Sequence, residues 1–482
     1  MNQVITKGKI ITSLLWKLFE RMGKKVITFV ISIILARLLL PRDFGIVVLA
    51  RVFIDIVITF IENGFSVALI QKKDADELDF SSVFYFGLGV AAICYVVLWF
   101  VAPGIASFYK IPEIKGVLRL LSVIIFLGTV NSIQDAILSK NMQFKKSFKI
   151  VISSVLISAV IGIWMAYHGF GVWALVWQKI ISYVVTCIIM FFLVKWYPKL
   201  MFSFERIKVL FSFGVKTFFA SVLNFAYNDL CSLVIGKSFS SADLGIYNKG
   251  ITFPQFIVSN LDGPIQAVMF PAFAIYQEDK ARLKDMVRRS IVTSCFFIIP
   301  AMVGLAVVAE PLVRVLLTEK WLACVFFLQC ACIKFAFWPI QTANMQVLKG
   351  MGHGTTLLRI EIIKKIVCVA GFCIAAFVFR NLKAVVIFDA VTTLLSVLIS
   401  TLPNSQFIKY TFRDQILDIM PSVLLSLAMG AVILLLGKIG LGPVSTMLLQ
   451  AFVGMAVYFS LSWLFKLESF RYLIKILRRE KE

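Results

Sequence analysis

The chain consists of long apolar runs joined by short connections in which most of the charged residues lie. A helix needs about 20 apolar residues to cross a hydrocarbon core about 30 Å thick. Runs of that length recur from near the N-terminus to Phe465, which predicts an all-α, polytopic membrane protein with about fourteen transmembrane helices. The expected helices cover residues 12–38, 43–70, 81–106, 114–139, 148–167, 172–194, 208–236, 243–275, 287–309, 322–348, 358–379, 384–408, 416–437 and 443–465.

The amino-acid composition is that of a membrane protein. Of the 482 residues, 60% are hydrophobic and 16% charged, against about 45–50% and about 25% in soluble domains. A formal charge of +23 suggests nucleic acid in a soluble protein, but here Lys and Arg lie mainly between apolar runs. We therefore attribute the charge to membrane topology, expect no nucleic-acid partner, and place both termini in the cytoplasm by the positive-inside rule. No cleavable signal peptide is expected.

An internal repeat appears when the sequence is shifted by 200 residues. Asp43-Phe44-Gly45-Ile46 then aligns with Asp243-Leu244-Gly245-Ile246, and Glu62-Asn63-Gly64 with Asp262-Gly263-Pro264. Six predicted helices separate the copies, so both enter the membrane in the same direction. A parallel repeat implies two lobes related by an axis along the membrane normal, with the substrate between them near the midplane.

Polar residues form a stripe on each of the four repeated helices, at spacings of three and four. The stripes are Lys17, Arg21, Lys24, Thr28 and Ser32; Arg51, Asp55, Thr59, Glu62 and Ser66; Thr217, Ser221, Asn224, Asn228 and Ser232; and Gln255, Ser259, Asp262 and Gln266, in which the apolar Ile251 takes the first position. Snorkelling or ordinary interhelical hydrogen bonds account for residues near helix ends, such as Lys17 and Arg21. A charge at the bilayer centre costs at least about 2.5–3.5 kcal/mol, so the deeper charges should face protein or a water-filled cavity. These are Lys24, Lys25, Arg51, Asp55 and Asp229.

Four segments carry a resemblance to a known family: residues 34–45 (ILARLLLPRDFG), 64–71 (GFSVALIQ), 169–175 (GFGVWAL) and 244–248 (LGIYN). Their order resembles the polysaccharide-transporter branch of the multidrug/oligosaccharidyl-lipid/polysaccharide exporter superfamily, the Wzx-type flippases. The similarity is closest to the subgroup that exports colanic and teichuronic acid repeat units. It extends across most of the chain and is strongest in the first 180 residues.

The resemblance implies two six-helix lobes arranged as a V around a central cavity, with helices thirteen and fourteen as an accessory pair. Residues 1–200 would form the N-lobe, 201–412 the C-lobe, and 413–482 the accessory pair and a basic cytoplasmic tail. It also implies a substrate of undecaprenyl-diphosphate-linked oligosaccharide, moved from the inner to the outer leaflet of the bacterial inner membrane by alternating access. Membrane lipids, the polysaccharide polymerase and the chain-length machinery are the other partners it suggests.

A diphosphate headgroup needs fixed cations in a cavity where their field is weakly screened. Arg51 is the first choice, because a guanidinium can bind phosphate oxygens bidentately. The alternative is a structural ion pair between Arg51 and Asp55 on the same helix face. The candidate substrate-binding residues are Lys24, Lys25, Arg51, Lys216, Lys249 and Lys334, with Asn224 and Asn228 for sugar hydroxyls.

Coupling to an ion gradient requires buried carboxylates. Asp229, Glu361 and Asp389, with Thr392 one turn beyond Asp389, are candidates for an oxygen-rich Na⁺ or H⁺ site in the second lobe. The alternative for Glu361 is neutralisation by Lys364, three residues further along the helix. No other cofactor and no metal are expected.

Two other classes of function are alternatives to the flippase. A multidrug or cation exporter of the same fold favours an acidic, aromatic cavity over a cationic one. A membrane glycosyltransferase or acyltransferase would draw on Asp74-Ala75-Asp76 as a DxD-like metal site, although a solvated charged loop is the simpler interpretation. The segment Lys349–Gly354 lacks the GK[ST] ending of a P-loop and predicts a tight turn. A transporter that is not an enzyme is the preferred interpretation.

Overall fold

The computed structural model describes residues 7–61, 69–70, 72, 75–208, 230–440 and 442–471. Within these ranges the chain is almost entirely helical and contains no strand. It divides into two compact units, Met1–Gly245 and Ile246–Glu482. The lobe boundaries at residues 200 and 412 remain predictions.

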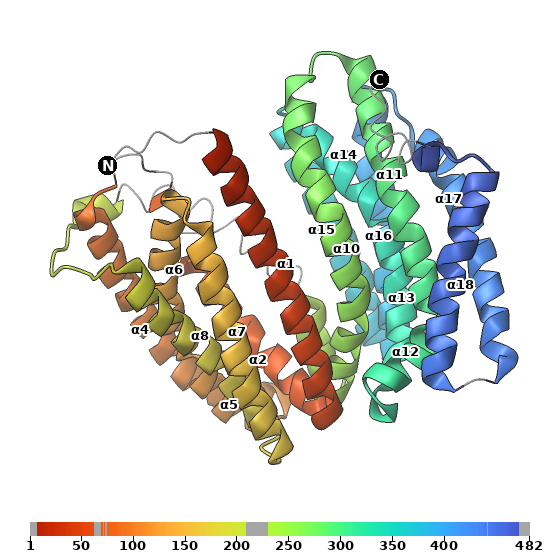
Figure 1. The fold of residues 1–482 in the computed structure, drawn as a ribbon. Helices are drawn as coiled ribbons and strands as arrows, with labels where there is room; N and C mark the ends of the chain where they lie inside the picture. Colours follow the sequence, from red (N-terminus) through yellow and green to blue (C-terminus); the bar gives the residue numbers. More distant parts are fainter. Residues whose placement is uncertain are drawn as a thin grey trace. The chain divides into compact units, whose positions relative to one another are not determined.

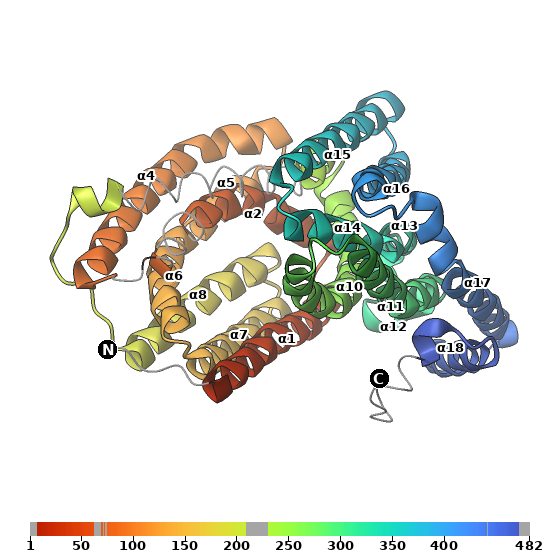
Figure 2. The ribbon, with the colours of Figure 1, turned by 90° about the horizontal axis from the view of Figure 1, so that it is seen from above.

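The helices of the first unit run up and down beside one another. Helix α1 packs against α7, α7 packs against α8, and α8 packs against α6 (Figures 1 and 2). Helix α5 contacts both α2 and α4. The bounds are α1 Lys7–Leu38, α2 Pro41–Ile61, α4 Glu77–Tyr109, α5 Glu113–Leu121, α6 Ile124–Lys140, α7 Phe144–Tyr167 and α8 Val172–Val194.

The second unit is organised around α11 and α16. Helix α11 packs against α13, α14 and α17, and α16 packs against α13, α14 and α15. Helices α17 and α18 lie side by side at the outer edge of this unit (Figure 2). The bounds are α10 Ser241–Ile275, α11 Lys280–Val307, α12 Ala309–Leu316, α13 Cys324–Ala336, α14 Trp338–Gly350, α15 Gly354–Ile374, α16 Leu382–Phe407, α17 Phe412–Leu436 and α18 Pro443–Leu464.

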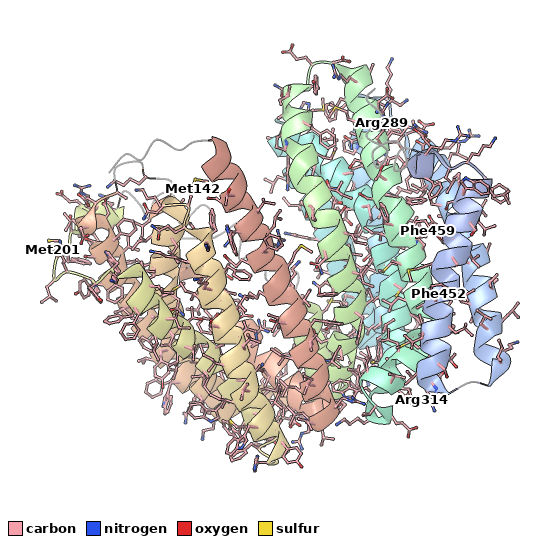
Figure 3. All side chains as sticks on the ribbon, viewed as in Figure 1. Met142, Met201, Arg289, Arg314, Phe452 and Phe459 are labelled. Atoms are coloured by element: carbon pink, nitrogen blue, oxygen red, sulfur yellow. The ribbon has the colours of Figure 1, made fainter. Side chains whose placement is uncertain are left out.

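Ten helices of the described part of the chain are long and apolar enough to cross a membrane. In the second unit, Phe452 and Phe459 lie along α18, and Arg289 and Arg314 lie toward opposite ends of the unit (Figure 3). The polytopic all-α prediction is confirmed. The count of fourteen remains a prediction, because most of the expected helix 208–236 lies outside the described residues.

Two predicted helices are each built from two pieces. The expected helix 114–139 breaks between α5 and α6, where the Ser122 hydroxyl donates to the Leu118 carbonyl, a bond that commonly bends helices. The expected helix 322–348 breaks between α13 and α14, where Pro339 lacks the amide hydrogen needed to continue the helix. The short helix α12 occupies a stretch predicted as a connection, and buries Ala309 and Val313 on one face.

The internal repeat is visible in local structure at the starts of α2 and α10. The Asp43 carboxylate accepts a hydrogen bond from the amide of Leu40 at 3.0 Å, and Asp243 accepts one from the amide of Ser240 at 3.1 Å. Both carboxylates therefore lie in the first helical turn and bind an amide three residues earlier, where negative charge is favoured by the helix dipole.

The glycines that follow these aspartates bring two backbones into direct contact within the first unit, to which α10 belongs as far as Gly245. A Cβ atom on Gly45 would overlap the carbonyl oxygen of Ser241. A Cβ atom on Gly245 would overlap the carbonyl oxygen of Pro41. The contact is reciprocal, because each glycine lies against the residue four positions before the other.

Candidate functional site

The polar stripe of α1 meets a carboxylate from α6 in the first unit. Lys17 Nζ lies 2.8 Å from Glu20 Oε1, and Asp135 on α6 interacts electrostatically with Lys17, Glu20 and Lys24. The Glu20 side chain is buried, and its second oxygen has no hydrogen-bond partner among the described residues. Lys24 is exposed and Lys25 is half-buried. The basic residues of the stripe thus lie beside two carboxylates, Glu20 and Asp135.

Asp135 was not among the residues singled out from the sequence. The sequence did contain a reason to consider it, since a carboxylate inside a predicted transmembrane helix is energetically costly and usually functional. However, Asp135 lies outside the four helices of the internal repeat, from which most of the candidate residues come. Its proximity to the α1 cations depends on the packing of helices more than 100 residues apart, which helical periodicity does not report.

Arg51 and Asp55 form an ion pair on α2, with Nη2 and Oδ2 2.8 Å apart. This is the structural pairing considered as the alternative for Arg51. The Arg51 side chain is still 43% exposed, and its buried Nε has no hydrogen-bond partner among the described residues. One edge of the guanidinium is therefore held by Asp55, while Nε retains the capacity to donate to another acceptor.

In the second unit, Lys249 is almost fully buried, with 4% of its surface exposed. Its Nζ lies 5.8 Å from the centre of the Trp321 ring, and the thiol of Cys324 is close enough to interact electrostatically. An ammonium over an indole face is a favourable cation–π arrangement. Lys249 therefore belongs to the interior of this unit.

Lys334 and Asp389 are brought together, although the sequence assigned them different roles. Lys334 Nζ lies 2.9 Å from Asp389 Oδ2, joining α13 to α16 across 55 positions of sequence. The pair lines a small pocket together with Tyr247, Ile251 and Phe327. A lysine and an aspartate in contact leave less charge for an anion or a cation than either would alone.

The remaining predicted ion-coupling residues bind within their own helices. Glu361 Oε1 lies 2.8 Å from Lys364 Nζ, the neutralising pair considered from the sequence. The Thr392 hydroxyl donates to the backbone carbonyl of Asp389 at 3.1 Å. Four predicted site residues, Lys216, Asn224, Asn228 and Asp229, lie outside the described residues, so the ion-coupling site stays a prediction.

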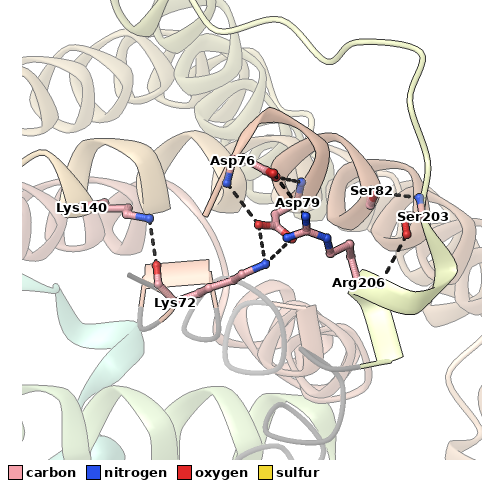
Figure 4. A network of polar contacts seen from close by, with 7 residues as sticks. All are labelled: Lys72, Asp76, Asp79, Ser82, Lys140, Ser203 and Arg206. Atoms are coloured by element: carbon pink, nitrogen blue, oxygen red, sulfur yellow. Dashed lines mark hydrogen bonds and ion pairs between the residues drawn. The ribbon is translucent and has the colours of Figure 1, made fainter. Parts of the chain in front are cut away.

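A polar cluster at one end of the first unit anchors the connection that follows α8 (Figure 4). The Asp79 carboxylate is fully buried and accepts hydrogen bonds from Lys72 Nζ at 2.7 and 2.6 Å. Arg206 Nη1 approaches the same carboxylate at 3.5 Å. The amide of Ser203 donates to the Ser82 hydroxyl at 2.9 Å, so α4 binds this connection through both charge and hydrogen bonds.

Asp76, half of the DxD-like tripeptide, is occupied by helix capping. Its side chain accepts from the Asp79 amide at 2.9 Å, and the Asp79 carboxylate accepts from the Asp76 amide at 3.1 Å. This reciprocal capping box lowers the pKa of Asp76, chiefly through the hydrogen bond from the Asp79 amide. Asp74 lies outside the described residues. In the described ranges no three His, Cys, Asp or Glu residues are grouped to hold a metal ion.

Comparisons with known proteins agree with a membrane transport fold. A family model described as "Polysaccharide biosynthesis protein" matches residues 34–326. The chain is 26% identical over 344 residues to the succinoglycan biosynthesis transport protein ExoT of Rhizobium meliloti (strain 1021), covering 71% of this chain and 69% of ExoT. It is 25% identical over 312 residues to the teichuronic acid biosynthesis protein TuaB of Bacillus subtilis (strain 168), covering 63% of this chain and 62% of TuaB, less than two thirds of that relative.

Among solved structures, the lipid II flippase MurJ in an inward closed conformation superposes with a TM-score of 0.78. The match covers 96% of this chain and 100% of that structure at 17% sequence identity, and at this identity it shows a common fold. The family model covers more than half of the sequence. The chain therefore belongs to the family of polysaccharide biosynthesis proteins.

Proposed function

We propose that this chain is a flippase that moves undecaprenyl-diphosphate-linked oligosaccharide repeat units from the inner to the outer leaflet of the bacterial inner membrane. The family, the transport protein among its relatives and the fold shared with a lipid II flippase support this assignment. These relatives are transport proteins, and on this proposal the chain is a transporter and not an enzyme.

The observation that carries the proposal is a guanidinium with spare donor capacity on a helix of a polytopic membrane protein. Arg51 uses one nitrogen on Asp55, and its buried Nε is unsatisfied among the described residues. A diphosphate supplies the anionic acceptors that such a group binds, with shorter and stronger hydrogen bonds than neutral partners form. An exporter of cations would not benefit from this arrangement.

The wider proposal concerns topology and partners. Two lobes, residues 1–200 and 201–412, would rock in alternating access around a cationic cavity, with 413–482 as accessory helices and tail and both termini in the cytoplasm. Lys24, Lys25 and Lys216 would contribute positive charge directly, and Asn224 and Asn228 would contact sugars. Lys249, buried in the second unit, and Lys334, paired with Asp389, would add their charge in another state of the transport cycle. The polymerase and the chain-length machinery would act on the exported unit.

Deletion of the gene tests the proposed function. In a strain without a redundant exporter, undecaprenyl-linked repeat units should accumulate on the inner leaflet and surface glycan should disappear. Lipid-linked intermediates are measured by extraction and mass spectrometry, and their leaflet by accessibility to a membrane-impermeant glycan probe. Normal surface glycan in the deletion strain would refute the flippase assignment.

Replacing Arg51 with alanine is expected to lower the rate of flipping about 10- to 100-fold, because a hydrogen bond to a charged group contributes about 1.5–3 kcal/mol. Arg51→Lys should retain part of the activity, since lysine keeps the positive charge but cannot donate the two parallel hydrogen bonds of a guanidinium. Arg314→Ala is the matched control, because Arg314 pairs with Glu310 at the same i,i+4 spacing on the exposed face of α12. Equal activity of Arg51→Ala and Arg314→Ala would rule out Arg51 as the phosphate contact.

A further inference from the structure

The second unit contains a buried carboxyl group that the polar pairs described above do not include. Asp262 on α10 is 3% exposed. Its Oδ1 accepts a hydrogen bond from Gln266 Nε2 at 3.0 Å, and its Oδ2 accepts one from the Thr342 hydroxyl of α14 at 2.8 Å. Both partners are neutral, and none of the ion pairs among the described residues includes Asp262.

The charged groups of neighbouring helices are engaged elsewhere. The hydrophobic core that includes Phe273, near the C-terminal end of α10, also contains residues of α11, α14, α16 and α17. On α16 Asp389 is paired with Lys334, and on α17 Asp418 is paired with Arg288 of α11 at 2.9 Å. The titratable group that α11 presents to Asp262 is the fully buried thiol of Cys295. An ionised carboxylate in such surroundings is costly without a cation.

The hydrogen bonds of Thr342 accommodate both protonation states. Its hydroxyl oxygen lies 2.8 Å from Asp262 Oδ2, 3.2 Å from the Trp338 carbonyl and 3.1 Å from the Pro339 carbonyl. One hydroxyl has a single hydrogen to donate. With Asp262 ionised, that hydrogen points to the carboxylate. With Asp262 protonated, the carboxyl donates to Thr342 and the threonine donates to a backbone carbonyl, so only a hydroxyl rotation separates the two arrangements.

A second observation indicates a missing donor at the same place. Gln266 is 6% exposed, and its Oε1 has no hydrogen-bond partner among the described residues although its Nε2 binds Asp262. Buried acceptors left unpaired cost about 1–3 kcal/mol. Rotation of the amide by 180° would place Oε1 against a protonated Oδ1 and satisfy this oxygen. A carboxyl group carries only one proton, so this is an alternative to donation to Thr342: with the proton on Oδ1 and the amide rotated, the carboxyl would donate to Oε1 while Thr342 still donates to Oδ2.

We propose that Asp262 is a proton-binding site of the second unit, with Thr342 and Gln266 as its hydrogen-bonding partners. Pro264, two residues further along α10, interrupts the backbone hydrogen bonds of the helix next to the carboxyl. Uptake and release of the proton would change how α10 binds α14 at this point. Proton binding stands on this geometry alone, whereas its use to drive export rests on the proposed function.

Infrared difference spectroscopy of the purified full-length chain tests proton binding directly. Titration from acidic to alkaline pH should remove a carbonyl band of a protonated carboxyl group, and Asp262→Asn should lack that band. Asp418→Asn is the control, because its carboxylate forms an ion pair with Arg288 at 2.9 Å and the band should remain. The melting temperature of each variant establishes that it is folded. An unchanged band in folded Asp262→Asn would overturn the proposal.

Transport in proteoliposomes tests the coupling. An imposed pH gradient should accelerate flipping by the wild type, and this acceleration should fall at least tenfold in Asp262→Asn, whose amide imitates the protonated state. Acceleration by a sodium gradient at constant pH, with none from a pH gradient, would overturn proton coupling. Failure of the wild type to flip any lipid-linked glycan would instead refute the proposed function and leave the infrared result standing.

Discussion

Replacing Gly45 with alanine is expected to abolish transport and to reduce the yield of folded protein severely. The added methyl group would overlap the backbone carbonyl of Ser241, and a backbone cannot rotate out of the way as a side chain can. The first turns of α2 and α10 would have to move apart. We expect this to cost more free energy than the about 1–3 kcal/mol that is typical of overpacking. Fluorescence-detected size-exclusion chromatography measures folding, and restoration of surface glycan in the deletion strain measures transport.

The same contact predicts a particular result for the double variant. Gly245→Ala should be as harmful as Gly45→Ala, because its methyl group would overlap the Pro41 carbonyl. The first substitution already separates the two helices, so the second methyl group meets less steric overlap. The double variant should therefore lose less stability than the sum of the losses in the two single variants. Gly89→Ala in α4 is the control, since nothing lies within 4 Å of its Cβ position. Full activity of Gly45→Ala would show that this close approach is not required.

Replacing Asp79 with alanine is expected to destabilise the first unit by about 3–5 kcal/mol, the usual cost of removing one partner from a buried ion pair. Lys72 would lose both of its hydrogen bonds to the carboxylate, and the capping box with Asp76 would lose one half. Asp79→Asn should be intermediate, because it keeps the shape and one acceptor. Thermal unfolding followed by tryptophan fluorescence in detergent measures the loss.

The control for Asp79 lies two residues earlier on the same helix. Glu77 is 52% exposed and lies 3.4 Å from Lys199, itself 62% exposed. Exposed pairs of this kind contribute about 0–1 kcal/mol, so Glu77→Ala should unfold close to the wild-type temperature. Similar shifts for Asp79→Ala and Glu77→Ala would contradict the assignment of Asp79 as the anchor of the connection after α8.

Much of the helical architecture could be predicted from hydrophobic runs, although helix ends and breaks could not. The expected helix 81–106 extends to Glu77–Tyr109, because the capping box begins it a turn earlier. The breaks at Ser122 and before Pro339 depend on single side chains inside apolar stretches that read as continuous. A stretch of about 20 residues is needed to recognise a transmembrane helix from its hydropathy, and the mean over such a stretch hides the effect of a single residue.

The candidate site was predictable in its residue types but not in its pairings. Helical spacing indicated that Arg51 and Asp55, and Glu361 and Lys364, could meet, and both pairs form. The pairing of Lys334 with Asp389 was not foreseen, because each was considered alone for a different role. The role of Asp262 was likewise hidden, since its partner Thr342 comes from another helix 80 positions away.

By itself the sequence determined that this is an all-α membrane protein with an internal repeat and with charges on the faces of its helices. Apolar length and helical period are local properties, and each is written into neighbouring residues. The tertiary structure decided which of those charges neutralise one another, which carboxyl groups are left with neutral partners, and where two glycines allow backbones to touch. Such contacts join residues distant in sequence, and their energies depend on the burial and geometry that packing alone creates.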